Sequence, residues 1–153
     1  MHCSQPNERR NMTTGTSHVA ALGRLLLAVI FLFSGIGKIL APAMTQGYIA
    51  AAGLPFPSVA YLIAIVIEVG GATLLILGFQ TRPAALVLAI FSVAAALGFH
   101  HDFADQDQLL HFLKNISMAG GLLQVVAFGA GSFSIDARIG RPAAMSAAGQ
   151  QAR

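Results

Sequence analysis

One apolar stretch with an ionisable residue near its middle constrains this chain most strongly. It covers residues 58–79, and Glu68 lies close to its centre. A helix needs about 20 consecutive apolar residues to cross the hydrocarbon core of a bilayer. A carboxylate at that depth is costly unless it faces other helices and has a partner. The stretch therefore predicts a transmembrane helix inside a bundle, with a cation close to Glu68.

One face of this predicted helix is suited to close packing. At 3.6 residues per turn, the residues that share a face with Glu68 are Tyr61, Ala64, Gly71, Ala72 and Leu75. Small residues on a transmembrane helix let a neighbouring backbone come close. We therefore expect this face to point into the bundle.

The composition places the chain among integral membrane proteins. Hydrophobic residues make up 56% and charged residues 10% of its 153 residues, whereas a soluble domain is roughly 25% charged. A chain of this length holds a few spans and no separate soluble catalytic domain. Its basic residues lie at hydrophobic edges and in tails, without a basic cluster that would suggest nucleic acid. Cys3 is the single cysteine, which excludes an internal disulfide, a CxxC redox pair and a Cys-ligated metal site within one chain.

Three further stretches fit membrane spans, at residues 18–40, 84–99 and 109–128. The first ends in Ala41-Pro42-Ala43 and resembles a secretory signal. It is longer than the roughly 7 to 15 apolar residues of such a signal, and it carries Arg24 and Lys38 on one face. We therefore interpret it as a retained span. The predicted fold class is an all-α, integral membrane four-helix bundle.

Connections and small-residue pairs complete this prediction. Pro and Gly punctuate residues 42–57, where we expect a connection with a short interfacial helix at residues 48–52. Ala94-x-x-x-Gly98 and Ser117-x-x-x-Gly121 are candidate sites of close helix packing.

The basic residues of the exposed segments predict the orientation. Those that decide the prediction fall in the first, third and fifth segments, and they include Arg9, Arg10, Arg82, Arg138 and Arg141. Cytoplasmic segments are enriched in Lys and Arg, so both termini are predicted to be cytoplasmic. The expected organisation is a disordered N-terminal tail at residues 1–17, a transmembrane domain at residues 18–131 and a polar, basic tail at residues 132–153, disordered beyond Pro142. Translation could start at Met1 or at Met12, and the sequence leaves that choice open.

With this topology, the polar residues of the spans gather in the outer half of the bundle. They are Lys38, Glu68, His100, His111, Lys114 and Asn115. Lys38 and Lys114 are alternative counter-ions for Glu68, since pairing removes most of the cost of burying its charge. The other interpretation is structural, because polar residues between membrane helices often only hold the packing together.

The histidines and aspartates near the third span allow simpler interpretations. His100 and His111 could form a bis-histidine haem or metal site, or lie at the water boundary as interfacial residues. Asp102, Asp105 and Asp107 are expected in a solvated loop, since the glycine and distal glutamate of a calcium loop are missing. No metal site is predicted.

Short motifs along most of the chain resemble the DoxX family of small bacterial membrane proteins. The matching pieces are Arg24 with FLFSGIGKIL at 31–40, GLP at 53–55, Glu68-Val-Gly-Gly, Gly78 with Thr81-Arg82, His100, FLKN at 112–115 with Gly120-Gly121, and GAGSFSID ending at Asp136. The resemblance implies a four-span protein of the bacterial inner membrane. In some members the family is linked to quinone-dependent oxidation of sulfur compounds, and in others to membrane oxidoreductase complexes that resist oxidative or thiol stress.

The positions that match the family's motifs coincide with these polar residues, and their chemistry gives them candidate roles: lysine and asparagine donate to a carbonyl oxygen, and Glu68 or His100 carries a proton. Glu68 and His100 are the candidate catalytic residues, and Lys38, Lys114 and Asn115 the candidate ligand-binding residues. Arg24 and Arg82 are assigned to structure and orientation. Without a cysteine pair, electrons would pass through a bound quinone, the candidate cofactor, or through a partner subunit.

Three functional hypotheses follow. The first is a quinone-linked or oxidoreductase-associated membrane subunit, with its status as an enzyme left open. The second is a non-catalytic scaffold that recruits a soluble redox enzyme to the bilayer. The third, a transporter, ranks lowest because the sequence shows no internal repeat and no unwound segment within a span. A homo-oligomer is compatible with all three, and the sequence identifies neither substrate nor partner.

Overall fold

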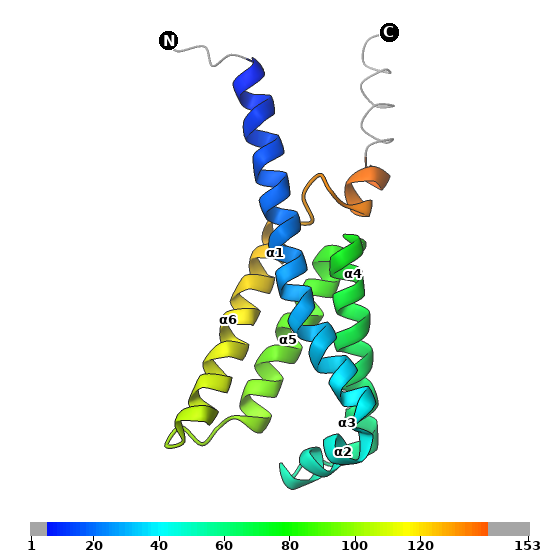
Figure 1. Cartoon of the computed structure of the whole chain (residues 1–153), viewed down its shortest axis with the longest axis vertical. Coiled ribbons are helices and arrows are strands. Elements are labelled where there is room, and N and C mark those ends of the chain that lie inside the picture. The colour runs from blue at the N-terminus through cyan, green and yellow to red at the C-terminus, as the bar shows by residue number, and fades with distance from the viewer. Residues whose placement is uncertain (1–5, 141–153) are drawn as a thin grey trace.

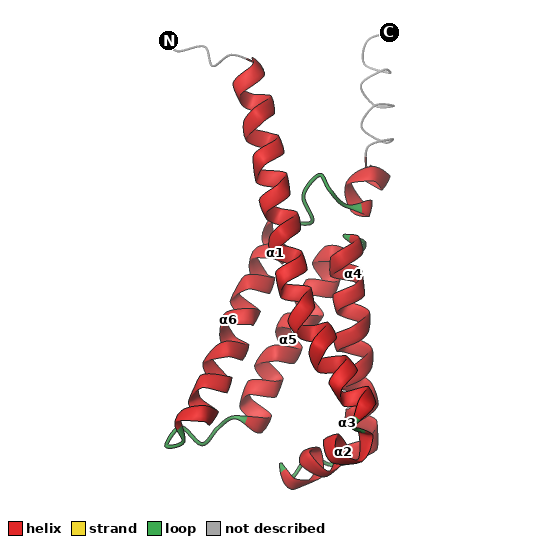
Figure 2. Cartoon of the chain, viewed as in Figure 1, coloured by secondary structure: helices red, strands yellow, loops and turns green. Residues whose placement is uncertain are grey.

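The computed structural model describes the backbone of residues 6–140 and the side chains of residues 17–140. Within that range the chain consists of helices and loops, without strands (Figure 2). The elements are α1 (Pro6–Leu40), α2 (Pro42–Ala51), α3 (Pro57–Ile65), the π-helical turn η1 (Val66–Gly70), α4 (Gly71–Leu77), α5 (Thr81–Phe99) and α6 (Gln106–Phe128). The elements α3, η1 and α4 form one continuous span.

Four helical segments of the described chain are long and apolar enough to cross a membrane. They cover Ser17–Leu40, Pro57–Leu77, Thr81–Phe99 and Gln106–Phe128. This confirms the predicted fold class of four membrane-spanning helices. In Figure 1, α2 and the α5–α6 connection lie at one end of the bundle, which we call the α2 end. The first and last described residues lie toward the other end, which we call the terminal end.

The expected domain boundaries shift at both ends. Helix α1 begins at Pro6, within the segment expected to be a disordered tail. Extending a helix that the span has already nucleated adds one hydrogen bond for each further residue fixed, and Pro suits the first helical turn. The expectation for residues 1–5, and that of disorder beyond Pro142, fall outside the described residues.

At the C-terminal side, residues after Gly131 pack on the bundle instead of leaving it as a tail. Ser132 Oγ donates to Ser17 Oγ at 2.6 Å, and the ring of Phe133 lies 4.4 Å from that of His18. Residues 135–140 form a short helical segment. The packed unit therefore extends beyond the expected boundary at residue 131.

Small residues and leucines make the core where the spans cross. Its buried members include Ala28, Phe31, Ala72, Leu75, Leu88 and Leu122. The inward face expected for the span around Glu68 is confirmed, because Ala64, Glu68, Ala72 and Leu75 are all buried. Gly71 brings that span close to α5, since a Cβ there would lie 2.8 Å from Leu88 Cγ.

Arg24 connects three segments at the terminal end. Its side chain is buried, and Nη1 donates to the Leu75 carbonyl at 2.7 Å while Nη2 donates to the Phe133 carbonyl at 2.7 Å. Leu75 lies in the last turn of α4, where carbonyls lack helical partners and a cation is favoured. Arg24 is therefore a structural residue that fixes α1, α4 and the C-terminal segment together.

Asp136 caps the next helix from the same segment. Its Oδ1 accepts from Gln80 N at 2.9 Å and its Oδ2 from Thr81 N at 3.0 Å, at the start of α5. Its own N–H donates to the Gly78 carbonyl at 2.9 Å. Burial raises the pKa of Asp136, but the hydrogen bonds from Thr81 and Gln80 and the charge of Arg24 outweigh it, so the pKa lies below its usual value.

Candidate ligand cavity

A cavity of about 480 Å³ opens in the half of the bundle nearer the α2 end. Its walls come from α1, α2, α3, η1, α5 and α6 and are mostly apolar. The aromatic members of the wall are Phe31, Tyr48, Phe91 and Phe99. Small-molecule sites have volumes of about 300 to 1,000 Å³ and mostly apolar walls with a few polar groups. The cavity matches that description.

Glu68 is held in a charged cluster at one side of this cavity. Lys38 Nζ lies 2.8 Å from Glu68 Oε2, donates to Glu68 Oε1 at 3.0 Å and donates to Ser34 Oγ at 2.7 Å. Ser34 Oγ in turn donates to Glu68 Oε1 at 3.0 Å. We call Ser34, Lys38 and Glu68 the Glu68 cluster. Oε2 has the ion-pair contact but accepts no well-aligned hydrogen bond from the described residues.

Local geometry places this carboxylate. Glu68 lies in η1, where the span widens into a π-helical turn, a feature often found at functional sites. Gly35 faces it from α1, and a Cβ at that position would lie 2.6 Å from Val69 Cγ2 and 3.3 Å from Glu68 Cβ. The absence of a side chain at Gly35 therefore lets α1 approach η1 closely enough for Ser34 and Lys38 to reach the carboxylate.

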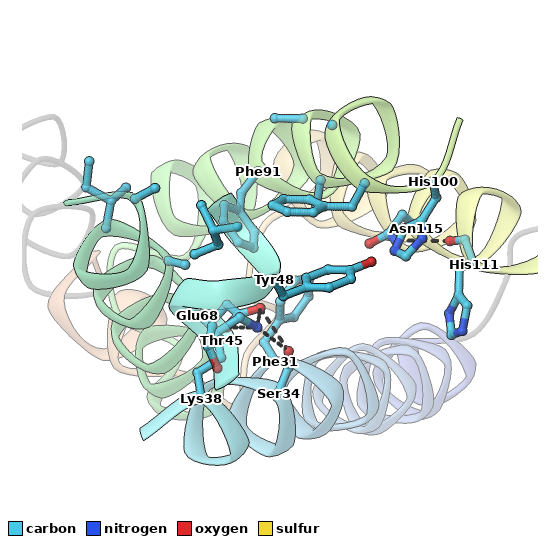
Figure 3. Close-up of a pocket in the computed structure, with 18 of the residues that line it drawn as sticks. Phe31, Ser34, Lys38, Thr45, Tyr48, Glu68, Phe91, His100, His111 and Asn115 are labelled. Atoms are coloured by element: carbon cyan, nitrogen blue, oxygen red, sulfur yellow. Dashed lines mark hydrogen bonds and ion pairs between the residues drawn. The ribbon is translucent and has the colours of Figure 1, made fainter. Parts of the chain in front are cut away.

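A second polar group lies at the opposite side of the cavity in Figure 3. Lys114 Nζ donates to His111 Nδ1 at 3.0 Å, and Asn115 Nδ2 donates to the His111 carbonyl at 3.0 Å. The rings of His100 and His111 stack with centroids 5.0 Å apart, and His100 Nδ1 lies 2.9 Å from Gln108 Oε1. We call His100, His111, Lys114 and Asn115 the His111 cluster.

These hydrogen bonds fix the histidine tautomers by chemical reasoning. The amide oxygen of Gln108 only accepts, so His100 Nδ1 carries a proton. The ammonium of Lys114 only donates, so His111 Nδ1 is unprotonated and its proton is on Nε2. In their neutral forms His100 therefore keeps Nε2 as an acceptor, and His111 keeps Nε2–H as a donor.

The structure brings together all the polar residues of the spans that were expected to gather in one half of the bundle. Lys38, Glu68, His100, His111, Lys114 and Asn115 all line the same cavity. Of the two alternative counter-ions for Glu68, Lys38 makes the ion pair. Arg24 and Arg82, which were assigned structural and orientation roles, are not among the lining residues.

The two candidate pairs of small residues have different outcomes. A Cβ at Gly98 would meet no atom within 4 Å, and Gly98 lines the cavity together with Ala94. The expected close packing at this pair is therefore absent, and the missing side-chain volume contributes to the cavity. Gly121 does lie at a close contact, since a Cβ there would be 3.3 Å from Leu27 Cδ2.

Metal binding receives no support from the described residues. They contain no group of three or more His, Cys, Asp or Glu side chains arranged to hold a metal ion. Asp105 caps α6 by accepting from Asp107 N at 2.8 Å, and Asp102 accepts from Ala104 N at 3.2 Å. The acidic loop therefore has a local structural role.

Among the residues that build the site, Tyr48 and Gln108 were missed in the sequence, as was Ser34 of the Glu68 cluster. Tyr48 lies in α2, which is twice the expected length because Pro42 starts it, and its ring stacks on Phe99 with centroids 5.3 Å apart. Gln108 fixes His100 from the first turn of α6. An aromatic residue in a short interfacial helix is a usable signal for the first, but nothing in the acidic loop distinguished Gln108.

Comparison with known proteins settles the family. Residues 19–101, more than half of the chain, match the DoxX family model. The chain belongs to the DoxX family. Inner membrane protein YqjF of Escherichia coli K12 is 37% identical over 115 residues, which cover 75% of this chain and 87% of YqjF. Inner membrane protein YphA of the same organism is 34% identical over 122 residues, which cover 76% of this chain and 87% of YphA.

No solved structure matches the chain. This DoxX family protein has four helices able to span a membrane, and both of these relatives are inner membrane proteins. It is therefore a multi-pass protein of the inner membrane.

Proposed function

We propose that this protein is a quinone-linked membrane subunit that serves an oxidoreductase system in sulfur, thiol or oxidative-stress metabolism. The observation that carries the proposal is the Glu68 cluster, a buried carboxylate paired with Lys38 in the wall of an apolar cavity of about 480 Å³. Ionisable residues inside membrane spans mark functional sites by default, because their burial is costly.

The lining residues fit a quinone on three counts. Apolar and aromatic side chains suit its ring, and the ammonium groups of Lys38 and Lys114 and the amide of Asn115 are donors for carbonyl oxygens. Glu68 Oε2, which accepts no well-aligned hydrogen bond from the described residues, keeps acceptor capacity for a protonated ligand oxygen. A bound quinone would supply two-electron, two-proton redox chemistry.

The chain's own residues would bind the ligand and hold protons. Lys38 and Ser34 hold the carboxylate of Glu68 in place, with Oε2 as a proton acceptor within the cavity. His100 has its Nδ1–H fixed by Gln108, and its Nε2 is a second proton acceptor near the α2 end. In this proposal Glu68 and His100 are therefore the catalytic residues, while Lys38, Lys114 and Asn115 bind the ligand.

Growth under redox stress tests whether the cavity matters in cells. The chromosomal copy is deleted and replaced by the wild type, Lys114→Ala, Glu68→Gln or Gln124→Ala, and growth is followed with a redox-cycling quinone and with a thiol oxidant. Gln124 is an exposed residue of α6 outside the cavity lining and provides the matched control. We expect resistance with the wild type and the control, and sensitivity with the two cavity variants.

A non-catalytic scaffold would give another pattern. If both cavity variants reach wild-type levels in the membrane and restore full resistance, the ligand-site function is wrong. The protein would then act by recruiting a soluble redox enzyme, and the cavity residues would only hold the bundle together.

A further inference from the structure

Polar groups occupy two separate parts of the cavity wall. The Glu68 cluster comes from α1 and η1, and the His111 cluster from α6 and from His100, the residue that follows α5. Figure 3 shows them on opposite sides, with the ring of Tyr48 between them. Within the described chain no hydrogen bond or ion pair joins the two clusters. A ligand that fills the cavity therefore meets polar partners at both of its ends.

The wall between the clusters is aromatic. Tyr48 and Phe99 stack at a centroid distance of 5.3 Å and an interplanar angle of 14°, and Phe31 and Phe91 line the cavity with them. Aromatic rings pack favourably against another flat ring in offset or edge-to-face arrangements. The middle of the cavity therefore suits a flat, apolar ring.

The two ends differ in charge and exposure. The side chain of Glu68 is 5% exposed and that of Lys38 is 24% exposed, so this end is the deep one, and its charges compensate each other. Lys114 and His111 are exposed, and within the described chain His111 is the hydrogen-bond partner of Lys114 and no carboxylate forms an ion pair with it. The end of the cavity at the His111 cluster is therefore the open one, which we call the mouth. It carries the ammonium of Lys114, which has no ion-pair partner among the described residues, and the Nε2–H donor of His111.

We propose that the ligand is a ring with two oxygens in para positions, a 1,4-dione, bound across the cavity with one oxygen at each cluster. This inference rests on the proposed function and adds to it the chemical class and orientation of the quinone. The third N–H of Lys38, beyond those given to Ser34 and Glu68 Oε1, donates to the deep oxygen, and Lys114 and Asn115 donate to the oxygen at the mouth. A ring with a single oxygen satisfies only one of the two clusters.

A series of ligands with one ring and a varying number of oxygens tests this orientation. Duroquinone has two para oxygens, 2,3,5,6-tetramethylphenol has one, and durene has none. The chain contains no Trp, so Phe91→Trp places a single tryptophan in the cavity wall. Quenching of its fluorescence, excited at a wavelength that tyrosine does not absorb, reports duroquinone in nanodiscs. The other two compounds are measured by displacement of duroquinone, and Met118→Trp, also in the lining, replaces the reporter if the first variant does not fold.

We expect duroquinone to bind about tenfold more tightly than the phenol, because one hydrogen-bonded end is lost. Ser34→Ala, which removes the hydrogen bond that positions Lys38, and Lys114→Met should each weaken duroquinone about tenfold. The effects should multiply in the double variant because the sites are separate. The phenol should be sensitive to one of the two substitutions at most. Gln124→Met, on the same helix as Lys114, should leave all affinities unchanged.

The orientation of the ligand and the presence of a quinone site would be contradicted by different results. If the phenol binds as tightly as duroquinone while both bind better than durene, the two-ended orientation is wrong and a quinone site remains. If duroquinone binds no better than durene, or if Gln124→Met weakens it as much as Lys114→Met does, the cavity is not a quinone site and both proposals are wrong.

Discussion

At the scale of single residues, the ion pair between Lys38 and Glu68 connects stability with the proposed function. Glu68 is buried, and Lys38 is its cationic partner within the described chain. Removing one member of a buried pair leaves an uncompensated charge, whereas removing both often changes stability little. Each residue of the pair therefore offsets the cost of burying the charge of the other.

A double-mutant cycle tests this dependence. We predict that Lys38→Met lowers the free energy of unfolding by about 3 kcal/mol, and that Lys38→Met combined with Glu68→Gln recovers most of that loss. Thermal unfolding in mild detergent, followed by circular dichroism, measures the differences. A Lys38→Met protein as stable as the wild type would show that Glu68 does not depend on Lys38.

The polar residues were also the part of the site that the sequence revealed best. Glu68, Lys38 and Lys114 stand out because charges are rare within spans. Which lysine pairs with Glu68 could not be predicted, since both lie within reach at the level of helix ends. The choice depends on the approach of α1 to η1, which is a tertiary property.

At the scale of elements, glycine positions determine how closely the helices approach. Gly35 lies against Val69 and Glu68, whereas a Cβ at Gly37, two residues further along α1, would meet no atom within 4 Å. The two glycines therefore have opposite expected responses to the same substitution.

We predict that Gly35→Ala destabilises the protein by about 2 kcal/mol through overpacking and separates Lys38 from Glu68. Gly37→Ala should stabilise it by about 0.5 to 1 kcal/mol, since Ala is the better helix former. Thermal unfolding of the two variants side by side gives the comparison. Equal responses would mean that α1 does not approach η1 as described.

The C-terminal segment gives a prediction about pH. The pKa of Asp136 lies below its usual value, so its contribution to stability is complete above the unfolded pKa of about 3.9 and is lost as the pH falls through the lower, folded pKa. Asp136→Ala should cost about 1 kcal/mol at pH 7, as for other helix caps. The difference from wild type should shrink below pH 4.

Melting curves of wild type and Asp136→Ala at several pH values between 7 and 3 measure this. A difference that stays constant over the whole range would show that the carboxylate charge has no part in holding the segment. Residues 132–136 were assigned to a tail because their composition is polar, and their anchoring depends on the α4–α5 turn and on Arg24, which are distant in sequence.

The lengths of the apolar stretches located all four spans, but the internal irregularities of the spans were not predictable. The π-helical turn η1 has no composition signal, because Val66–Gly70 is apolar apart from Glu68. The pair Ala94 and Gly98 was interpreted as a packing site, and its small volume instead contributes to the cavity. Small residues can pack against a neighbouring helix or leave space for a ligand. At Ala94 and Gly98 they leave space, because α5 and α6 diverge from the other spans toward the α2 end (Figure 1).

At the scale of the whole molecule, an even number of spans puts the two ends of the described chain on one side. The basic residues of the exposed segments predict that this side is the cytoplasm. Reporter fusions check the orientation. A green fluorescent protein fused after Gly140 should fluoresce, and alkaline phosphatase inserted between Phe103 and Ala104 should be active in the periplasm. Active alkaline phosphatase after Gly140 would contradict the predicted orientation.

This orientation places the cavity in the outer half of the bilayer. Quinones dissolve in the hydrocarbon core because they are apolar, and the cavity lies among the spans, where such a ligand is already concentrated. The bundle is thus closed at the terminal end by Arg24 and Asp136 and holds the candidate ligand cavity at the α2 end.

Native mass spectrometry of the protein purified in mild detergent, combined with lipid extraction, tests the central claim most directly. We predict that a quinone is bound to the wild type and to Gln124→Met, and that it is lost in Glu68→Gln and Lys114→Ala while these variants stay folded. A wild-type protein without quinone, or a quinone that both cavity variants retain, would contradict the account.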